Sequence, residues 1–310
     1  MIAAAALSVL LAAQETTFKV DVRLVRMLVT VKDAGGQLAG YLEKGDFAIF
    51  DNEIQQEIAV FEHHTEQPLS VSVMVDTSAS TGRELSYEVN SVGRFLRAIF
   101  REGNTKDAVA LYSFTHGVHL RSSFTRNLAR LEGELKQLRP EAGTSLYDAT
   151  WFAAKDLEDR EGRHVIVLVT DGGDTTSTIK FGEALERAHQ ADAVIYSVLV
   201  VPINSDAGRN VGGENALTTF SRSTGGRVFT PSTGEQLDET FRQILQDLRT
   251  QYLLGFYPRN IPLTSERFHR VRLETPARPE LRASARSGYY GEYDASAPHN
   301  NPRGKSPRKP

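Results

Sequence analysis

Short apolar runs alternate with amphipathic stretches through the middle of the chain. The runs at residues 69–75 (LSVSVMV) and 164–170 (HVIVLVT) are rich in β-branched residues, which is typical of strands buried on both faces. Around them, apolar residues recur every three to four positions over helix-length stretches. Such alternation predicts βαβ units, and therefore a Rossmann-like, doubly wound and mostly parallel sheet with helices on both faces.

The same pattern gives the order of elements in this region. We expect strands at 69–75, 107–114, 117–124, 164–170, 193–200 and 227–231, and helices at 83–101, 128–138, 145–158, 181–191, 214–224 and 235–249. Turn-like residues 115–117 predict a hairpin, which would give the sheet one antiparallel edge strand. Ser145 and Asp148 fit the acidic form of a capping box at the start of one helix.

Both flanks of this region carry a different pattern. Residues 18–32 alternate apolar and polar positions, which predicts a half-buried strand of an antiparallel sheet. A turn at 34–37 and short strands around Asp51 and Asn52 follow, and residues 251–290 also read as strands. Because neither flank alone has enough strands for a stable sheet, we expect the two to pair. The α/β domain would then be inserted into a small β-sandwich made by both ends.

The ends of the chain complete this division. The apolar run up to Ala13 ends in small residues and resembles a signal peptide, although no Lys or Arg precedes it. The last twenty residues are rich in Pro, Asn, Ser and basic residues, which predicts a disordered tail. The expected segments are therefore a signal peptide (1–13), a β-rich flank (14–66), the α/β domain (67–250), a second β-rich flank (251–290) and the tail (291–310). A signal peptide predicts a secreted or periplasmic protein.

Composition narrows the function classes. The 310 residues are enough for two domains, and no stretch reaches the ~18 apolar residues that a membrane span needs. A net charge of -3 gives no overall electrostatic footprint for nucleic acid. The absence of cysteine excludes disulfides, thiolate zinc sites and cysteine nucleophiles.

Three polar segments of the α/β region carry the candidate chemistry. DTSAS (76–80) and TDGGD (170–174) directly follow the two clearest strands, and GTS (143–145) precedes a helix. Loops at the carboxyl ends of parallel strands meet at one edge of a sheet, so these segments can meet too. Their hydroxyls and carboxylates are hard oxygen donors, which suit Mg²⁺ or Mn²⁺ and not zinc. The candidate ligands are Asp76, Ser78, Ser80, Thr144 and Asp171.

Plainer interpretations exist for several of these residues. Ser78 and Ser80 could be turn or helix N-cap residues, and Thr144 could be only a helix cap. His116 and His119 are spaced HxxH, but on a turn and strand they would not share a face, and no third metal ligand is evident. The usual motifs for nucleotide binding and serine hydrolysis are absent from the sequence.

Taken together, DTSAS, GTSLYDA and LVTDGGD resemble the metal-ion-dependent adhesion site of von Willebrand factor type A (VWFA) domains. The resemblance covers roughly residues 68–250, and the flanks at 22–62 and 251–290 resemble the secreted bacterial "VWFA-related" family. It implies that Ser78, Ser80 and Thr144 bind the metal through their hydroxyls, with Asp76 and Asp171 acting directly or through water. It also implies that a Glu or Asp of a partner protein takes the sixth position.

The resulting expectation is an exported, non-enzymatic adhesion or scaffold protein that binds an acidic side chain of another protein through Mg²⁺. One alternative is a Mg²⁺-dependent phosphoester hydrolase, since the same oxygens could hold a Lewis-acid metal. Against it, the sequence offers no evident general base and no Gly-rich phosphate loop. A second alternative is a purely structural metal site.

The loop at residues 202–213 also follows a strand. We expect it to lie at the same edge of the sheet as Asp76 and Asp171.

Overall fold

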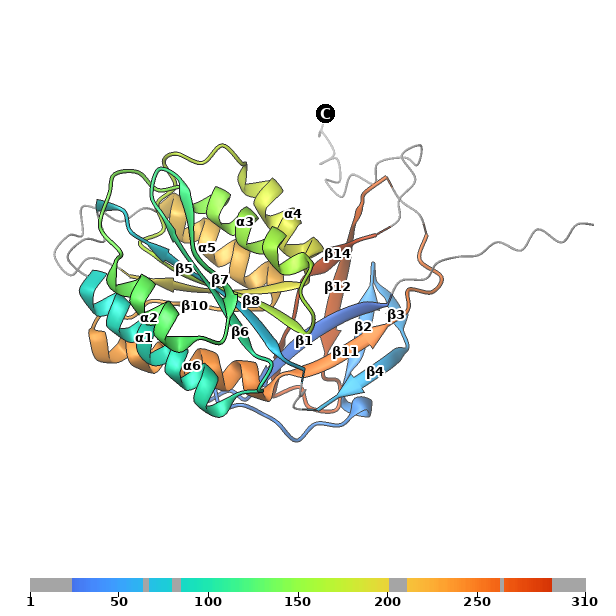
Figure 1. The fold of residues 1–310 in the computed structure, drawn as a ribbon. Helices are drawn as coiled ribbons and strands as arrows, with labels where there is room; N and C mark the ends of the chain where they lie inside the picture. Colours follow the sequence, from blue (N-terminus) through green and yellow to red (C-terminus); the bar gives the residue numbers. More distant parts are fainter. Residues whose placement is uncertain (1–23, 64–66, 80–84, 201–210, 263–264, 292–310) are drawn as a thin grey trace, which may run out of the picture.

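The structure is a computed structural model that describes residues 24–63, 67–79, 85–200, 211–262 and 265–291. A helix-covered central sheet lies beside two smaller antiparallel sheets (Figure 1). The predicted fold class, an α/β domain with a β-sandwich built from both flanks, is confirmed. The expected signal peptide, the tail and most of the segment 202–213 lie outside the described residues, as does the start of the 18–32 strand.

The central sheet is six-stranded and has the order β10-β9-β8-β5-β6-β7. All neighbours pair in parallel except β6 and β7, which form the predicted antiparallel hairpin at one edge. The chain builds one half of the sheet outward from β5 and the other half outward from β8, so the strand order reverses between these two neighbours. The strands are β5 (Leu69–Asp76), β6 (Ala108–Phe114), β7 (Val118–Thr125), β8 (Arg163–Thr170), β9 (Ala193–Leu199) and β10 (Val228–Phe229).

Helices cover both faces of this sheet (Figure 1). One face packs under α1 (Leu85–Glu102), α2 (Leu128–Lys136) and α6 (Gly234–Thr250). The other packs under α3 (Leu146–Glu158), α4 (Phe181–Gln190) and α5 (Val211–Thr224). Because consecutive strand residues point to opposite faces, the apolar runs without alternation supply both cores at once.

The predicted capping box at the start of α3 is wrong. Ser145 is the N-cap residue, but its hydroxyl bonds to Thr176 Oγ1 (2.8 Å) and not to the first turn of the helix. The carboxylate of Asp148 accepts hydrogen bonds from the backbone N–H groups of Thr178 and Ile179. The hydroxyl of Ser177 takes over the capping role, since it accepts from the first amides of α3. A segment distant in the sequence therefore caps this helix, and the local spacing of residues could not have predicted it.

The two flanks pair across the whole length of the chain to form the sandwich. One sheet has the order β13-β1-β11-β4 and the other β14-β12-β2-β3, and both contribute to a shared core. β1 pairs with β11, and β2 pairs with β12, so each sheet needs strands from both ends. The strands are β1 (Val25–Lys32), β2 (Ala48–Asp51), β3 (Ile54–Gln56), β4 (Ile58–Glu62), β11 (Tyr252–Phe256), β12 (Phe268–Glu274), β13 (Arg282–Ser284) and β14 (Gly288–Tyr290), with a short 3-10 helix at Lys44–Asp46.

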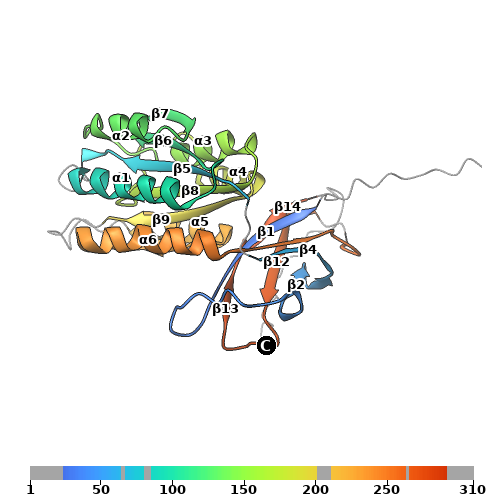
Figure 2. The same ribbon diagram turned by 60° about the horizontal axis from the view of Figure 1, so that its bottom comes forward.

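The sandwich packs against the amino-terminal edge of the central sheet, and α6 runs directly into β11 there (Figure 2). Arg286, which follows β13, donates to Asp192 and to the backbone oxygens of His189 and Gly288. On the other side of the junction, Lys32 Nζ lies 2.7 Å from Asp247 Oδ1 of α6. The carboxyl ends of the central strands consequently face away from the sandwich.

His189 is buried at this junction, and we expect it to make the stability of the fold depend on acid. Its ring lies 5.2 Å from the Phe268 ring, and its Nδ1 has no hydrogen-bond partner among the described residues. Burial, with the nearby Arg286 charge, lowers the pKa of His189 to about 3. The unfolded chain takes up a proton near pH 6.5 and the folded protein does not, so the free energy of unfolding falls by up to about 1.4 kcal/mol per pH unit below 6.5.

We therefore expect His189→Gln to flatten the acid limb of the stability curve. Urea unfolding of both proteins between pH 7.5 and 4.5 measures this, with pH 7.5 as the baseline for lost packing. By pH 4.5 the wild type loses up to about 2–3 kcal/mol more than the variant, because only the wild type excludes a proton from this position. Parallel curves for the two proteins would show that His189 is not held neutral by the fold.

No helix in the described part of the chain is both long enough and apolar enough to cross a membrane.

Candidate functional site

Two of the predicted ligands lie where the strand order of the central sheet reverses. Asp76 is the last residue of β5, and Asp171 directly follows β8, its parallel neighbour. In open α/β sheets, the crevice at the carboxyl ends of such strands is where ligands bind. The topology alone therefore brings the two carboxylates to the place where a site is expected.

Asp76 is fully buried and held by its neighbours. Its Oδ1 accepts from the backbone N–H of Ser78 (2.8 Å), and its Oδ2 accepts from the hydroxyl of Thr170 (2.6 Å). The Ser78 hydroxyl also bonds to this carboxylate. Burial raises the pKa of Asp76 to about 6 against these hydrogen bonds, and the negative charge of Asp171 acts in the same direction as burial. A carboxylate so placed is oriented by fixed donors beside a second negative charge.

The Thr144 segment is tied to both of these loops. On one side, the N–H of Glu141 donates to the Thr77 oxygen (2.8 Å), and Ser78 and Glu141 form a parallel bridge. On the other, the Thr144 N–H donates to Thr175 Oγ1 (3.0 Å), and its oxygen accepts from the Thr175 N–H (2.8 Å). Thr144 is not the cap of α3, because Ser145 holds the N-cap position and the Ser177 hydroxyl accepts from the amides of the first turn.

Gly143 lets this segment approach the β6–β7 turn. Its φ of +85° lies in the left-handed region that favours glycine. A methyl group there would lie 3.0 Å from Cα of His116, whose N–H donates to the Ala142 oxygen. The turn between β6 and β7 thereby supports the loop that carries Thr144.

The structure thus places Asp76, Ser78, Thr144 and Asp171 on three hydrogen-bonded loops at one edge of the sheet. Ser80 lies outside the described residues. The donors are carboxylate and hydroxyl oxygens, and two carboxylates lie close enough to repel each other. This donor set fits a hard divalent cation such as Mg²⁺, which would relieve the repulsion and usually keeps several water ligands.

Two groups outside the predicted ligand set shape this site. Thr170 donates to Asp76 and also accepts from the Gly172 N–H (3.1 Å), so it joins the two carboxylate loops. Thr175 and Thr176 hold the Thr144 backbone. The available signal for Thr170 was a hydroxyl at the end of the otherwise apolar run HVIVLV, at the same strand level as Asp76.

The weaker metal signals of the sequence do not gather into a site. Among the described residues, no group of three or more His, Asp or Glu side chains is placed to hold a metal ion.

Trp151 is half-buried against the α3–α4 core, and Lys155 and Arg187 lie over its ring at 5.3 and 5.0 Å. The side chain therefore has a packing role in this domain.

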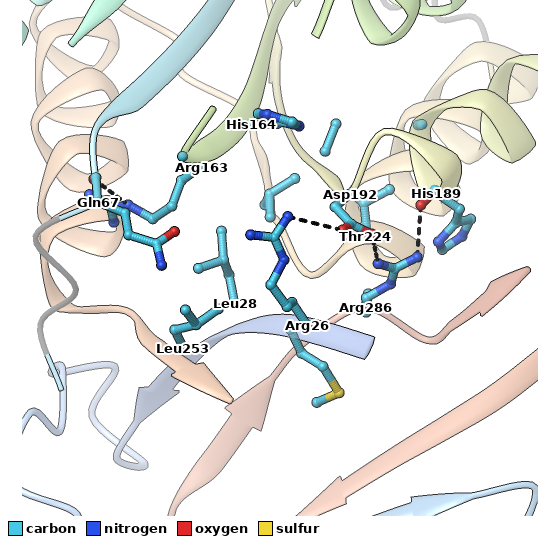
Figure 3. Close-up of a pocket in the computed structure, with 15 residues that line it drawn as sticks. Arg26, Leu28, Gln67, Arg163, His164, His189, Asp192, Thr224, Leu253 and Arg286 are labelled. Carbon is cyan, nitrogen blue, oxygen red and sulfur yellow. Dashed lines mark hydrogen bonds and ion pairs between the residues drawn. The ribbon is translucent and has the colours of Figure 1, made fainter. Parts of the chain in front are cut away.

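A small cavity lies at the opposite edge, between the α/β domain and the sandwich (Figure 3). Arg26 points into it from β1 toward Asp192, at 3.8 Å, and Arg286 approaches the same carboxylate. Both ring nitrogens of His164 already face backbone oxygens. The cavity volume of about 30 Å³ has room for only a few water molecules. Its groups serve the junction between the two domains.

The part of the chain that carries this site is similar to a known protein family. Residues 71–173 match the family model of the von Willebrand factor type A domain, a span that includes Asp76, Ser78, Thr144 and Asp171. No curated protein matches the chain.

Solved structures are similar to this chain at low sequence identity. A von Willebrand factor type A protein from Catenulispora acidiphila is 11% identical, with a TM-score of 0.50, covering 73% of this chain and 68% of that one. The open conformation of the pilus adhesin SpaC from Lactobacillus rhamnosus GG is 10% identical, with a TM-score of 0.50, covering 80% of this chain and 48% of that one. The PilB minor pilin from Streptococcus sanguinis is 13% identical, with a TM-score of 0.48, covering 60% of this chain. The chain spans 62% of the length of that pilin, less than two thirds.

Proposed function

This chain carries a von Willebrand factor type A domain, and we propose that the domain binds another protein through a Mg²⁺ ion at the carboxyl edge of its sheet. Asp76, Ser78, Ser80, Thr144 and Asp171 would hold the ion, directly or through water. An Asp or Glu of the partner would complete its coordination. The chain would act as a non-enzymatic adhesion or scaffold protein outside the cytoplasm, and Mn²⁺ could replace Mg²⁺.

One observation carries this proposal. The loops that bear Asp76, Thr144 and Asp171 are joined by hydrogen bonds into one unit at the point where the strand order reverses. If Asp76 and Asp171 act mainly through water, a bound Mg²⁺ would keep much of its positive charge. The surrounding hydroxyls are uncharged and cannot neutralise the ion. Such an ion therefore attracts the carboxylate of another molecule.

Selection from a random peptide library tests the proposal without a known partner. The immobilised protein is offered the library with Mg²⁺, and bound peptides are eluted with EDTA. We expect the eluted peptides to share an Asp or Glu, and to be retained poorly by Asp76→Asn or without metal. Peptides that bind equally well without metal, or that lack acidic residues, would contradict the proposed mode of binding.

The same protein distinguishes the two alternatives. A structural metal site predicts that Mg²⁺ raises the melting temperature although no peptide is selected. A hydrolase predicts Mg²⁺-dependent release of nitrophenol from a generic nitrophenyl phosphate, lost in Asp76→Asn. The adhesion proposal predicts no such release.

A further inference from the structure

Two backbone segments from different parts of the α/β domain meet beside Asp171. Gly172 directly follows Asp171, and Gly213 lies in the first turn of α5. A methyl group added at Gly213 would overlap the carbonyl group of Gly172, so the two backbones are in direct contact. An approach of this kind is open to glycine alone among the residue types.

Gly172 is enclosed from this side. Its φ of +91° is in the left-handed region. A methyl group there would lie 3.3 Å from Cδ1 of Leu199, at the end of β9, and 3.4 Å from Cδ1 of Leu217 in α5. Leu217 is fully buried. The first two turns of α5 therefore form the wall against which the segment after Asp171 rests.

The other end of α5 is fixed to the sandwich. The N–H of Ser287 donates to the Ser223 oxygen at 2.8 Å. A methyl group at Gly225, just beyond the helix, would lie 2.8 Å from the Ala285 backbone, so the chains touch there too. α5 has 14 residues and is about 21 Å long, and these two contacts lie near its opposite ends. It is braced at both ends, so its first turn has little freedom to move.

We propose that Gly213 is a positioning residue for the Asp171 carboxylate. Its contact with Gly172 holds the short segment whose amides orient the site: the Gly173 N–H donates to Asp171 Oδ1 (3.2 Å), and the Gly172 N–H donates to Thr170 Oγ1 (3.1 Å). Thr170 in turn donates to Asp76. Displacing Gly172 disturbs both carboxylates together.

Two readouts test this role in the full chain. The first is amide hydrogen exchange at Gly172 and Gly173 without metal, which does not depend on the proposed function. The second is the Mg²⁺ dissociation constant, which rests on it. We expect Gly213→Ala to speed exchange at both amides by about tenfold or more, because the overlap weakens the hydrogen bonds that these N–H groups donate to Thr170 and Asp171. Mg²⁺ affinity falls about tenfold, as is usual when groups behind a metal ligand are disturbed.

Gly133→Ala is the matched control. Gly133 lies in α2, and a methyl group there meets nothing within 4 Å. It should leave both readouts unchanged. Leu217→Ala serves where Gly213→Ala does not fold, since it loosens the same wall without creating an overlap. It should speed exchange at Gly172 and Gly173 more than at the amides of α2.

The outcomes separate the two claims. Unchanged exchange at Gly172 and Gly173 in the folded variants overturns the positioning role. Faster exchange in a protein whose wild type binds no Mg²⁺ supports the contact and rejects the metal site. Faster exchange with weaker Mg²⁺ binding supports both.

Discussion

Asp76→Asn is expected to abolish Mg²⁺ binding, with a loss of more than about 100-fold in affinity. The amide keeps the shape of the carboxylate and can still accept the Ser78 N–H, so the loop has no steric reason to move. It lacks the negative charge that a hard divalent cation requires. Calorimetric titration of Mg²⁺ into both proteins measures the difference directly.

Asp156→Asn is the matched control for this change. Asp156 also accepts a hydrogen bond from a hydroxyl, that of Tyr112 at 2.5 Å, but it lies on α3 outside the three loops. Its replacement should leave the Mg²⁺ affinity within about twofold of the wild type, since a screened charge away from the ion contributes little. Equal binding by wild type and Asp76→Asn would remove Asp76 from the site.

Lys32→Met is expected to lower the free energy of unfolding by about 3 kcal/mol. Lys32 of β1 reaches across the junction to Asp247 of α6, whose side chain is only 3% exposed. Among the described residues, Arg227 is the other cation paired with this carboxylate, with its Nε 3.6 Å from Asp247 Oδ2. Without Lys32, Asp247 keeps a buried charge that is only partly balanced. Urea unfolding at pH 7.5 measures the loss.

Two further variants show whether the loss comes from the buried charge. Lys32→Met combined with Asp247→Leu should recover most of the stability, because neither partner then leaves a buried charge. Glu57→Ala removes the exposed ion pair with Arg259 and should change stability by less than about 0.5 kcal/mol. If Lys32→Met alone lowers the free energy of unfolding as little as Glu57→Ala does, the Lys32–Asp247 ion pair does not hold the domains together.

The fold was predictable because its main signals are periodic. The continuous apolar runs at 69–75 and 164–170 are typical of strands covered on both faces, and they form the centre of the sheet. The sandwich followed from a different argument: each flank had too few strands to be stable alone. Pairing of β1 with β11 confirms that reasoning.

What the sequence did not predict depends on contacts between distant residues. The cap of α3 comes from Ser177, some thirty residues away, so the local spacing of Ser145 and Asp148 was misleading. The contact between Gly172 and Gly213 involves two residues that carry no chemistry of their own. Neither contact produces a periodic pattern, and each appears only once the sheet brings its strand ends together.

The candidate ligands could be predicted from the sequence only in part. Their residue types and their places at strand ends indicated hard-metal chemistry, and the strand order explains why the Asp76 and Asp171 loops are neighbours. The links from the Thr144 loop to the other two loops could not be predicted, because they run through backbone groups of Thr77, Glu141 and Thr144.

The most direct test of the central claim is anomalous diffraction from crystals of the protein grown with Mn²⁺. The proposal predicts one strong anomalous peak at the carboxyl edge of the sheet, with the hydroxyls of Ser78 and Thr144 about 2 Å away and Asp76 and Asp171 beside it. A fully occupied Mn²⁺ elsewhere, with only water between these four residues, would contradict it.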